Sequence, residues 1–320
     1  SNLDEKSYGL LMEELARVWA GLAGVIMIAA LGGVILEAQS ESLKNKLIPR
    51  LMAGELIGCG AITEPNAGSN AASIETTAVL DGGDWVINGT KTWISNGSIA
   101  DIVMVLCVTD KSKGPLGISQ ILVEKEVSPF TTRELHKLGL RAFPTSELAF
   151  VDCRVPSDNI VGDPALGYKR TMVTFERARA TLAVMSTGIA QAAVDAAINY
   201  ARERKQFGRP IGSFQMIQEM IADMIAETEA MRLLTYRAFD LIDKGERCRW
   251  QSSLAKAYAT ELAVDVTSKA IQVHGAVGLS DEYPVERYFR DARTMTIPDG
   301  TTQIQKLVVG REVIGIRAIA

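Results

Sequence analysis

The chain has 320 residues, of which 47% are hydrophobic and 22% are charged, and its formal net charge is -4. This composition is typical of a folded protein of two or three domains and argues against disorder. A slightly acidic chain without a basic stripe predicts no nucleic-acid partner. Two histidines cannot form a histidine-rich metal site, so we predict no metal. Four scattered cysteines without a CxxC pair favour a reduced cytoplasmic protein over a disulfide scaffold or zinc module.

Residues 5–56 have the pattern of helices, with Leu10, Leu11 and Leu15 at helical spacing. Within them, residues 18–36 form a run of nineteen uncharged residues, close to the length that spans a membrane. The run is rich in Ala and Gly, and no aromatic or basic belt flanks both of its ends. We therefore predict a buried helix and no membrane span. The charged residues 4–6 do not resemble a signal peptide.

Residues 58–161 consist of short β-rich runs separated by turn residues. Asn88-Gly89 lies between two such runs, residues 85–87 and 91–94. This dipeptide predicts a β-hairpin, because both central residues of the turn need positive φ. The segment is therefore predicted to form a compact antiparallel β-barrel or sandwich.

From residue 167 onward the periodicity is helical again. Four long amphipathic runs follow, at residues 187–204, 214–244, 252–274 and 303–316. Helices, then strands, then a helical bundle predict an α+β protein with segregated classes, divided into residues 1–56, 57–162 and 163–320. The chain has no GxGxxG and no GxxxxGK[ST] motif, so neither a Rossmann nucleotide site nor a P-loop is predicted.

Four segments have more particular sequences, at residues 63–70 (TEPNAGSN), 93–97 (WISNG), 204–211 (RKQFGRPI) and 299–305 (DGTTQIQ). Each alone has a structural interpretation. The first is a turn cluster, and Trp93 in the second is a core aromatic. The third is a solvated helix end that the macrodipole favours. In the fourth, Asp299-Gly300-Thr301 is a turn with an N-cap for the last helix.

Together, in this order and at these separations, the segments resemble the acyl-CoA dehydrogenase family of flavoproteins. The family pattern is TEPxxGSD, WITN, RxxFG, QxxGGxG and YEGTxxxQ. It is matched here by residues 63–70, 93–96, 204–208, 272–278 and 298–305, and residues 138–148 add a sixth match. The resemblance implies the family fold: an N-terminal helical domain, a middle β domain and a C-terminal four-helix bundle. The family's N-terminal domain starts before the position of Ser1, so that match is partial.

The resemblance implies that the chain binds FAD between the β domain and the bundle. Ile62 and Thr63 would then bond the flavin edge, Gly68 and Ser69 would approach the phosphates, and Trp93 and Ser95 would cover the ring. Arg204, Phe207 and Gln215 would hold the pyrophosphate and adenine side. Gln272 and Gly275 would contact the adenosine portion from a neighbouring subunit, and Thr301 and Gln303 would also reach FAD.

The resemblance further implies that the α-proton of an acyl-CoA thioester is abstracted while the β-hydrogen moves as hydride to flavin N5. The catalytic carboxylate, glutamate in the family, would be Asp299, whose backbone N–H would bind the thioester carbonyl. At the alternative family position of the base stands Ala178, which has no carboxylate. Glu176 would line the pantetheine tunnel with Arg179 as its partner, and Ser69 and Gly300 would also contact the substrate.

Asp299 is the informative departure from the family pattern, because aspartate retracts the carboxylate by roughly 1 to 1.5 Å. Three interpretations follow. The substrate is bulkier, branched or alicyclic, as in a cyclohexane- or cyclohexene-carboxyl-CoA dehydrogenase; the base acts on another carbon; or catalysis is impaired. Pro298, where tyrosine is frequent, favours the first.

An acyl-CoA dehydrogenase that passes electrons to an electron-transfer flavoprotein is the leading interpretation. One alternative is a thioester lyase, a decarboxylase or desulfinase, that uses the flavin pocket without net oxidation. Another is a non-catalytic member that binds flavin or CoA. The family resemblance also implies a homotetramer, located in the cytoplasm or, in a eukaryote, in the mitochondrial matrix.

Overall fold

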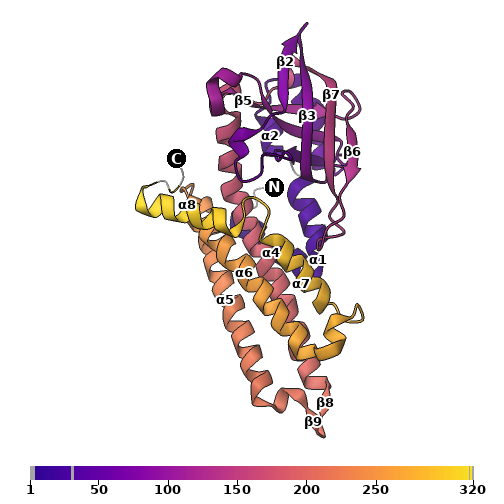
Figure 1. The fold of residues 1–320 in the computed structure, drawn as a ribbon, viewed down its shortest axis with the longest axis vertical. Coiled ribbons are helices and arrows are strands. Elements are labelled where there is room, and N and C mark those ends of the chain that lie inside the picture. Colours follow the sequence, from indigo (N-terminus) through magenta and orange to yellow (C-terminus); the bar gives the residue numbers. More distant parts are fainter. Residues whose placement is uncertain (1–3, 30–31, 317, 319–320) are drawn as a thin grey trace. The chain divides into compact units, whose positions relative to one another are not determined.

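The structure is a computed structural model that describes residues 4–29, 32–316 and 318 (Figure 1). The chain forms two compact units. Unit 1 contains residues 1–23, 138–140 and 175–320, and unit 2 contains residues 24–137 and 141–174. The predicted domain boundaries at residues 56 and 162 both fall inside unit 2.

Unit 2 is built on a sheet of seven strands in the order β1-β4-β2-β3-β7-β6, with β5 paired to β4. The strands are β1 (Gly58–Ala61), β2 (Thr77–Asp81), β3 (Asp84–Ser95), β4 (Ile102–Val108), β5 (Ile118–Glu124), β6 (Thr131–Glu134) and β7 (Thr145–Pro156). Most pairs are antiparallel, as predicted, but β4 runs parallel to both β1 and β2. In β4 and β5 the first six residues are all buried, and those of β4 form an apolar run without alternation.

The predicted hairpin at Asn88-Gly89 is wrong, because β3 runs through this dipeptide without turning. The turn lies instead at Gly82-Gly83, where β2 and β3 pair from Asp81 opposite Asp84. Gly89 has a φ of 151°, and a Cβ on it would lie 2.7 Å from the Cα of Thr76. The glycine therefore permits a close approach of two backbones beside a register shift, and no turn.

Two short helices cover part of this sheet, α2 (Gly32–Leu36) and α3 (Glu41–Met52). Ser40 caps α3, because its hydroxyl accepts a hydrogen bond from the Leu43 N–H at 3.2 Å. Leu43 and Leu47 pack in one apolar cluster with Ile102 of β4. The helical pattern predicted for residues 5–56 is confirmed for the described residues of this segment.

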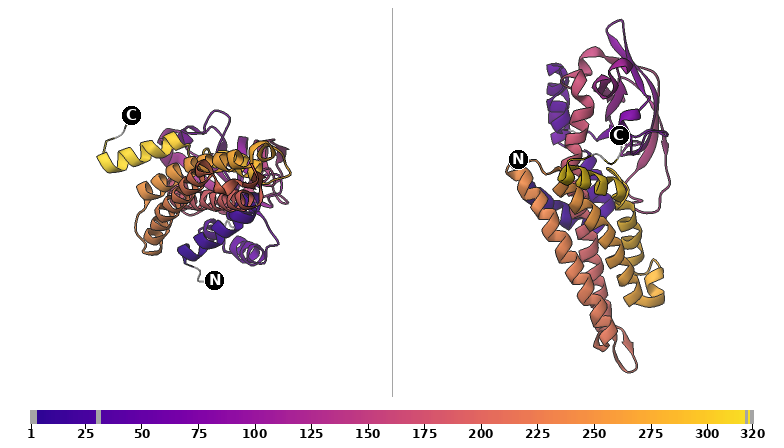
Figure 2. Two further views of the ribbon diagram at one scale, coloured as in Figure 1. Left: turned by 90° about the horizontal axis from the view of Figure 1, so that it is seen from below. Right: turned by 60° about the vertical axis from the view of Figure 1, so that its left-hand side comes forward.

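Unit 1 is helical. It contains most of α1 (Glu5–Ala29) and α4 (Gly167–Glu203), together with α5 (Gln215–Asp243), α6 (Arg249–His274), α7 (Val285–Met295) and α8 (Thr302–Ile314). Two-residue strands β8 (Lys205–Gln206) and β9 (Arg209–Pro210) form a hairpin at the far end of α4 and α5 (Figures 1 and 2). The sequence reasoning did not predict α7, which buries Val285, Ala292 and Met295.

The apolar run 18–36 falls in α1 and α2, and its residues 30 and 31 lie outside the described residues. By length and composition, Glu5–Leu36 and Pro164–Glu203 could each cross a membrane. The most apolar window is 78% buried in the second and 33% buried in the first. The predicted burial is therefore confirmed for one face of α1 only, because Val18, Trp19 and Leu22 are exposed.

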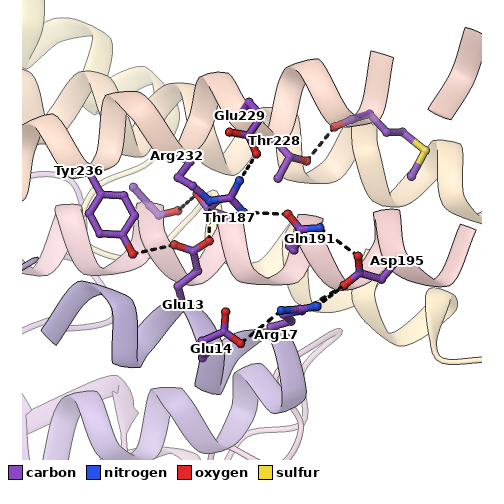
Figure 3. Close-up of polar contacts among 12 residues, drawn as sticks. Glu13, Glu14, Arg17, Thr187, Gln191, Asp195, Thr228, Glu229, Arg232 and Tyr236 are labelled. Atoms are coloured by element: carbon purple, nitrogen blue, oxygen red, sulfur yellow. Dashed lines mark hydrogen bonds and ion pairs between the residues drawn. The ribbon is translucent and has the colours of Figure 1, made fainter. Parts of the chain in front are cut away.

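A buried polar network attaches α1 to the bundle (Figure 3). The Glu13 carboxylate on α1 accepts hydrogen bonds from Arg232 Nε at 2.9 Å and from the Tyr236 hydroxyl at 2.8 Å, both on α5. Arg232 Nη2 also donates to Gln191 Oε1 on α4 at 2.8 Å. Burial and the adjacent Glu13 carboxylate raise the pKa of Tyr236. The charges are thus paired within unit 1, as buried charges must be.

Candidate active site

Asp299 lies in the loop of residues 296–301, which joins α7 to α8. Its φ is 53° and that of Gly300 is 94°, so two consecutive residues are left-handed. Aspartate adopts this conformation at lower cost than most residues with a Cβ. At Gly300 a Cβ would lie 2.7 Å from Gln305 Nε2. The loop thus depends on both residue types to present the Asp299 side chain.

Donors from three helices bind the carbonyl groups of this loop. Gln305 Nε2, on α8, donates to Asp299 O at 2.9 Å and to Gly300 O at 2.8 Å. Arg179 Nε, on α4, donates to Asp299 O at 3.3 Å. Lys256 Nζ, on α6, donates to Gly300 O and, at 3.3 Å, to Thr296 O. The left-handed conformation is therefore held from several sides.

The site is electropositive. Burial raises the pKa of the Asp299 carboxyl, whereas the positive charges of Lys256 and Arg179 act to lower it. Burial lowers the pKa of Lys256 to about 8 and also lowers the pKa of Arg179. No hydrogen bond among the described residues uses the Asp299 N–H. The loop therefore combines a perturbed carboxylate with a backbone donor, a combination suited to acid–base chemistry.

Glu176 is buried on α4 one turn before Arg179, but the two do not pair as predicted. Arg247 Nη2 donates to Glu176 Oε1 at 2.8 Å instead. Arg179 is directed to Asp299 O and to Ser253 Oγ, the latter at 3.5 Å. Glu176 and Arg179 are three positions apart in the helix, so their charges still interact. Arg247 is the salt-bridge partner that the sequence reasoning missed.

The first turn of α8 directly follows the loop of residues 296–301. Thr301 Oγ1 accepts a hydrogen bond from the Ile304 N–H at 3.4 Å, which confirms the predicted N-cap. Gln303 is exposed on the first turn of the helix. Unit 1 therefore places Arg179, Gly300 and Thr301 beside Asp299, with Glu176 near Arg179.

Unit 2 brings residues 62–64 beside β3. The Thr92 N–H donates to Thr63 O at 2.9 Å, and Lys91 Nζ donates to Ile62 O at 3.0 Å. Lys91, which is fully buried, also forms an ion pair with Glu64 at 2.8 Å. The two segments predicted to bind the flavin, residues 62–69 and 93–95, are thus adjacent.

Trp93 is not the core aromatic that its residue type alone predicted. Its side chain is 58% exposed, and its φ of 60° places it at a register shift between β3 and β7. Gly68 and Ser69 are exposed in the turn that follows residues 62–64, and a Cβ on Gly68 would meet no atom within 4 Å. Ser95 is half-buried opposite Thr145. The exposed Trp93 indole offers a flat face to a planar ligand such as flavin.

The remaining predicted cofactor residues lie at the other end of unit 1. Arg204 follows α4, Phe207 at the hairpin tip is 90% exposed, and Gln215 begins α5. Gln272 and Gly275 lie at the end of α6, which is near α4 because His274 stacks on Tyr200 at 4.4 Å. Along α6, Gln272 lies about 24 Å from Lys256 at 1.5 Å per residue. The β8–β9 hairpin lies at the opposite end of the bundle from α8 (Figure 1), so one chain holds these five residues far from its own Asp299.

Lys256 and Gln305 were also missed by the sequence reasoning. Gln305 ends the motif at residues 298–305, but a motif gives no bond partner. Lys256 is the only basic residue in the stretch 252–268, in which most residues are apolar or small, and this isolation was the available signal. Within the described residues, no three His, Cys, Asp or Glu side chains are grouped so that they could hold a metal ion.

Models of three acyl-CoA dehydrogenase domains match the chain: the N-terminal domain at residues 1–55, the middle domain at 59–153 and the C-terminal domain at 166–314. The chain is 41% identical over 309 residues to a probable acyl-CoA dehydrogenase of Mycobacterium leprae, covering 95% of the chain and 79% of the relative. It is 41% identical to the mouse mitochondrial short-chain specific acyl-CoA dehydrogenase, covering 97% and 76%. It is 40% identical to a cyclohexane-1-carbonyl-CoA dehydrogenase of Syntrophus aciditrophicus, covering 94% and 79%.

Solved structures agree. A structure described as electron transferring flavoprotein of Acidaminococcus fermentans has a TM-score of 0.95 and 37% identity, covering 98% of this chain and 83% of that one. A glutaryl-coenzyme A dehydrogenase with glutaryl-CoA gives 0.94 and 39%, covering 99% and 82%. A Mycobacterium smegmatis glutaryl-CoA dehydrogenase in complex with FADH2 gives 0.93 and 32%, covering 99% and 81%. The helical N-terminal, β half-barrel and helical C-terminal domains are those of one family, and the chain belongs to the acyl-CoA dehydrogenases, which are FAD-dependent oxidoreductases.

Proposed function

We propose that Asp299 is the base that removes the α-proton of the acyl-CoA substrate. The observation that carries this proposal is the left-handed loop, which presents a carboxylate next to Arg179 and Lys256 and leaves its own N–H unbonded. A general base must lie within hydrogen-bond reach of the proton that it takes, and a carboxylate can serve as one. The chain has no carboxylate at Ala178, the alternative position of the base.

The chain's residues would divide the reaction as follows. The Asp299 N–H donates a hydrogen bond to the thioester oxygen and stabilises the developing enolate, while an Asp299 carboxylate oxygen accepts the α-proton. Bound FAD supplies the acceptor for the β-hydrogen, which leaves as hydride. Glu176 and Arg247 face the pantetheine portion of the substrate, and Ser69 and Gly300 contact the acyl-CoA as well.

FAD would be bound by residues of more than one chain. Ile62, Thr63, Gly68, Ser69, Trp93 and Ser95 would hold the flavin and phosphates from unit 2, with Thr301 and Gln303 from unit 1. Arg204, Phe207, Gln215, Gln272 and Gly275 would hold the pyrophosphate and adenosine of a FAD in a neighbouring subunit. The separation of about 24 Å along α6 supports this division. It makes an oligomer, a homotetramer by family resemblance, necessary for a complete site.

The substrate would be a branched or alicyclic acyl-CoA. Aspartate is shorter than glutamate, and Pro298 is exposed where an aromatic side chain is frequent, so both changes leave room near the reacting carbon. Sequence identity does not distinguish between these substrates, because the mouse short-chain dehydrogenase and the cyclohexane-1-carbonyl-CoA dehydrogenase are 41% and 40% identical to this chain. The electron acceptor would be an electron-transfer flavoprotein, and the enzyme would work in the cytoplasm, or in the mitochondrial matrix of a eukaryote.

Anaerobic bleaching of the flavin by a panel of straight, branched and alicyclic acyl-CoAs tests this proposal. Asp299→Asn should keep FAD and acyl-CoA binding, and should slow bleaching by about 10²- to 10⁴-fold, the usual effect of losing a general base. Bleaching at the parent rate would mean that another group is the base. A lyase would form product with the flavin still oxidised, and a non-catalytic member would bind acyl-CoA without bleaching.

Asp299→Glu tests the substrate class, because it advances the carboxylate by one methylene. Relative to the parent, flavin bleaching by alicyclic substrates should be slower and bleaching by straight-chain substrates should be faster. Glutamate is less favourable than aspartate at a φ of 53°, so only the ratio between substrates is diagnostic. An unchanged ratio would remove the argument from the retracted base.

Arg204→Ala tests the shared cofactor site. The variant should lose FAD and dissociate more readily, since the pyrophosphate loses a charge-assisted contact of about 1.5 to 3 kcal/mol. Lys244→Ala, which removes an exposed cation from the C-cap of α5, is the control. Full flavin content of the Arg204 variant at low protein concentration would contradict this role.

A further inference from the structure

We propose that Lys256 is a positioning residue for the base: its ammonium fixes the main chain that presents Asp299, and its positive charge sets the pH range in which the Asp299 carboxylate is unprotonated. The inference deepens the proposed function and rests on Asp299 being the base. Lys256 acts through the 296–301 loop and does not itself need to touch the substrate.

The geometry of Lys256 is specific to this loop. Its side chain is fully buried in α6, and its two hydrogen bonds go to the carbonyl oxygens of Thr296 and Gly300. These carbonyls lie on either side of Asp299 in the sequence. One ammonium thus ties both ends of the segment whose left-handed backbone directs the carboxylate.

The charge of Lys256 has no bonded counter-ion. Among the described residues, no carboxylate oxygen lies within ion-pair distance of its Nζ, although Asp299 and Glu261 act on it at longer range. Neutral donors alone could satisfy two carbonyls, as Gln305 does on the same loop. A buried cation without a bonded anion is costly, so its charge calls for a role beyond hydrogen bonding.

Other charges face this site from each helix around the loop. The neighbours are Arg179 and Glu176 on α4, Arg249 and Glu261 on α6, Arg293 on α7 and Arg311 on α8. Of these, Arg179 and Lys256 act directly on Asp299. Burial raises the pKa of Asp299 and both cations oppose this, so loss of the Lys256 charge must raise that pKa further.

Lys256→Met and Lys256→Gln separate the two parts of the proposal. Methionine removes both donors and the charge, whereas glutamine keeps two N–H donors and removes only the charge. The control is Lys269→Met, which removes a cation from the same helix about 20 Å away, beyond the screening length. Lys269 pairs with Glu227 and Asp265 and lies outside the site.

Each FAD-loaded variant is tested in two ways. The first is anaerobic flavin bleaching by butyryl-CoA and by cyclohexane-1-carbonyl-CoA, as a function of pH. The second is infrared titration of the Asp299 carboxyl, identified by subtracting Asp299→Asn, which requires no turnover. In both Lys256 variants the infrared titration of the Asp299 carboxyl should move to higher pH by about one unit or more, that is, tenfold in proton affinity. The acid limb of the pH profile of the bleaching rate should move by the same amount. The plateau rate of Lys256→Gln should exceed that of Lys256→Met, and Lys269→Met should match the parent.

The outcomes are distinguishable. A folded, flavin-loaded Lys256→Gln with an unshifted carboxyl titration would overturn the electrostatic role. Equal plateau rates for Lys256→Gln and Lys256→Met would overturn the positioning role. Parent-like bleaching by Asp299→Asn would overturn the proposed base, whatever the lysine variants show. Should Lys256→Met fail to fold, Lys256→Gln still decides the electrostatic part against the parent.

Discussion

Two fully buried lysines, one in each unit, contrast in what they bind. Lys91 in β3 forms an ion pair with Glu64 at 2.8 Å and donates to Ile62 O. Among the residues that the structure describes, Lys256 in α6 binds only the carbonyls of Thr296 and Gly300. Both hold a segment that carries proposed site residues, but only the first has its charge neutralised locally.

The difference indicates two kinds of support. Glu64 also accepts the backbone N–H groups of Glu75 and Thr76, at 2.6 and 2.9 Å. Burial opposes its ionisation, but Lys91 and these donors outweigh burial and lower the pKa of Glu64. The Lys91–Glu64 pair is therefore a closed structural clamp. Lys256 is left with a charge that can act on Asp299, and the two lysines should respond differently to substitution and to pH.

Lys91→Met should have the largest effect. It leaves the Glu64 carboxylate buried without its cation, and breaking a buried pair in this way costs about 3 to 5 kcal/mol. Denaturant unfolding should show this loss, and hydrogen exchange should place it in β3 and residues 62–64. Adding Glu64→Gln should recover part of the loss, whereas Lys113→Met, at an exposed pair, should cost less than about 1 kcal/mol. A loss for Lys91→Met as small as that of the exposed control would remove the contrast.

The second largest effect should be on the pH dependence of the free energy of unfolding. The pKa of Lys256 is about 8 in the folded protein against an ordinary 10.5, so between these values the unfolded chain binds more protons. Stability contributed by this group must then rise with pH, because its destabilisation is full below about pH 8 and is relieved toward pH 10.5. The gain is at most about 3 kcal/mol. Unfolding free energies of the parent and Lys256→Met, compared across this window, should differ in slope, and equal slopes would contradict the buried charge.

Much of the fold could be predicted from local pattern, and the exceptions have a common physical cause. The long helices and the β-rich middle region follow from periodicity, which each segment displays by itself. The hairpin prediction at Asn88-Gly89 was wrong because the glycine lies against the backbone of Thr76, the residue just before β2. The prediction that Trp93 is a core aromatic was wrong because this residue lies at a register shift between β3 and β7. In both cases a tertiary contact overrides the local preference.

The residues of the candidate site also fall into two groups: those that a motif predicts and those that only tertiary packing brings to the site. Asp299, Glu176 and Arg179 could be proposed from motifs, since motifs retain the residues of a loop and a helix face. Their partners could not, because Arg247 lies in the α5–α6 connection, Lys256 on α6 and Gln305 on α8, and a motif does not say which of these segments pack together. The misassigned pairing of Glu176 shows this, since its bonded partner lies 71 residues away.

Gln305→Leu should have the smallest effect. It removes hydrogen bonds to the 296–301 loop without removing a charge, so it separates loop geometry from the charge of Lys256. Gln305 Nε2 donates to the carbonyls of Asp299 and Gly300 and carries no charge. Its loss should cost about 1 kcal/mol of stability and lower the plateau rate of flavin bleaching, because one donor that fixes the loop is missing. The acid limb should remain where it is in the parent, since the charges near Asp299 are unchanged. Gln218→Leu removes an exposed amide–carbonyl bond at the far end of unit 1 and serves as the control. A shift of the limb in Gln305→Leu as large as in Lys256→Gln would mean that loop geometry, and not the lysine charge, controls the ionisation of Asp299.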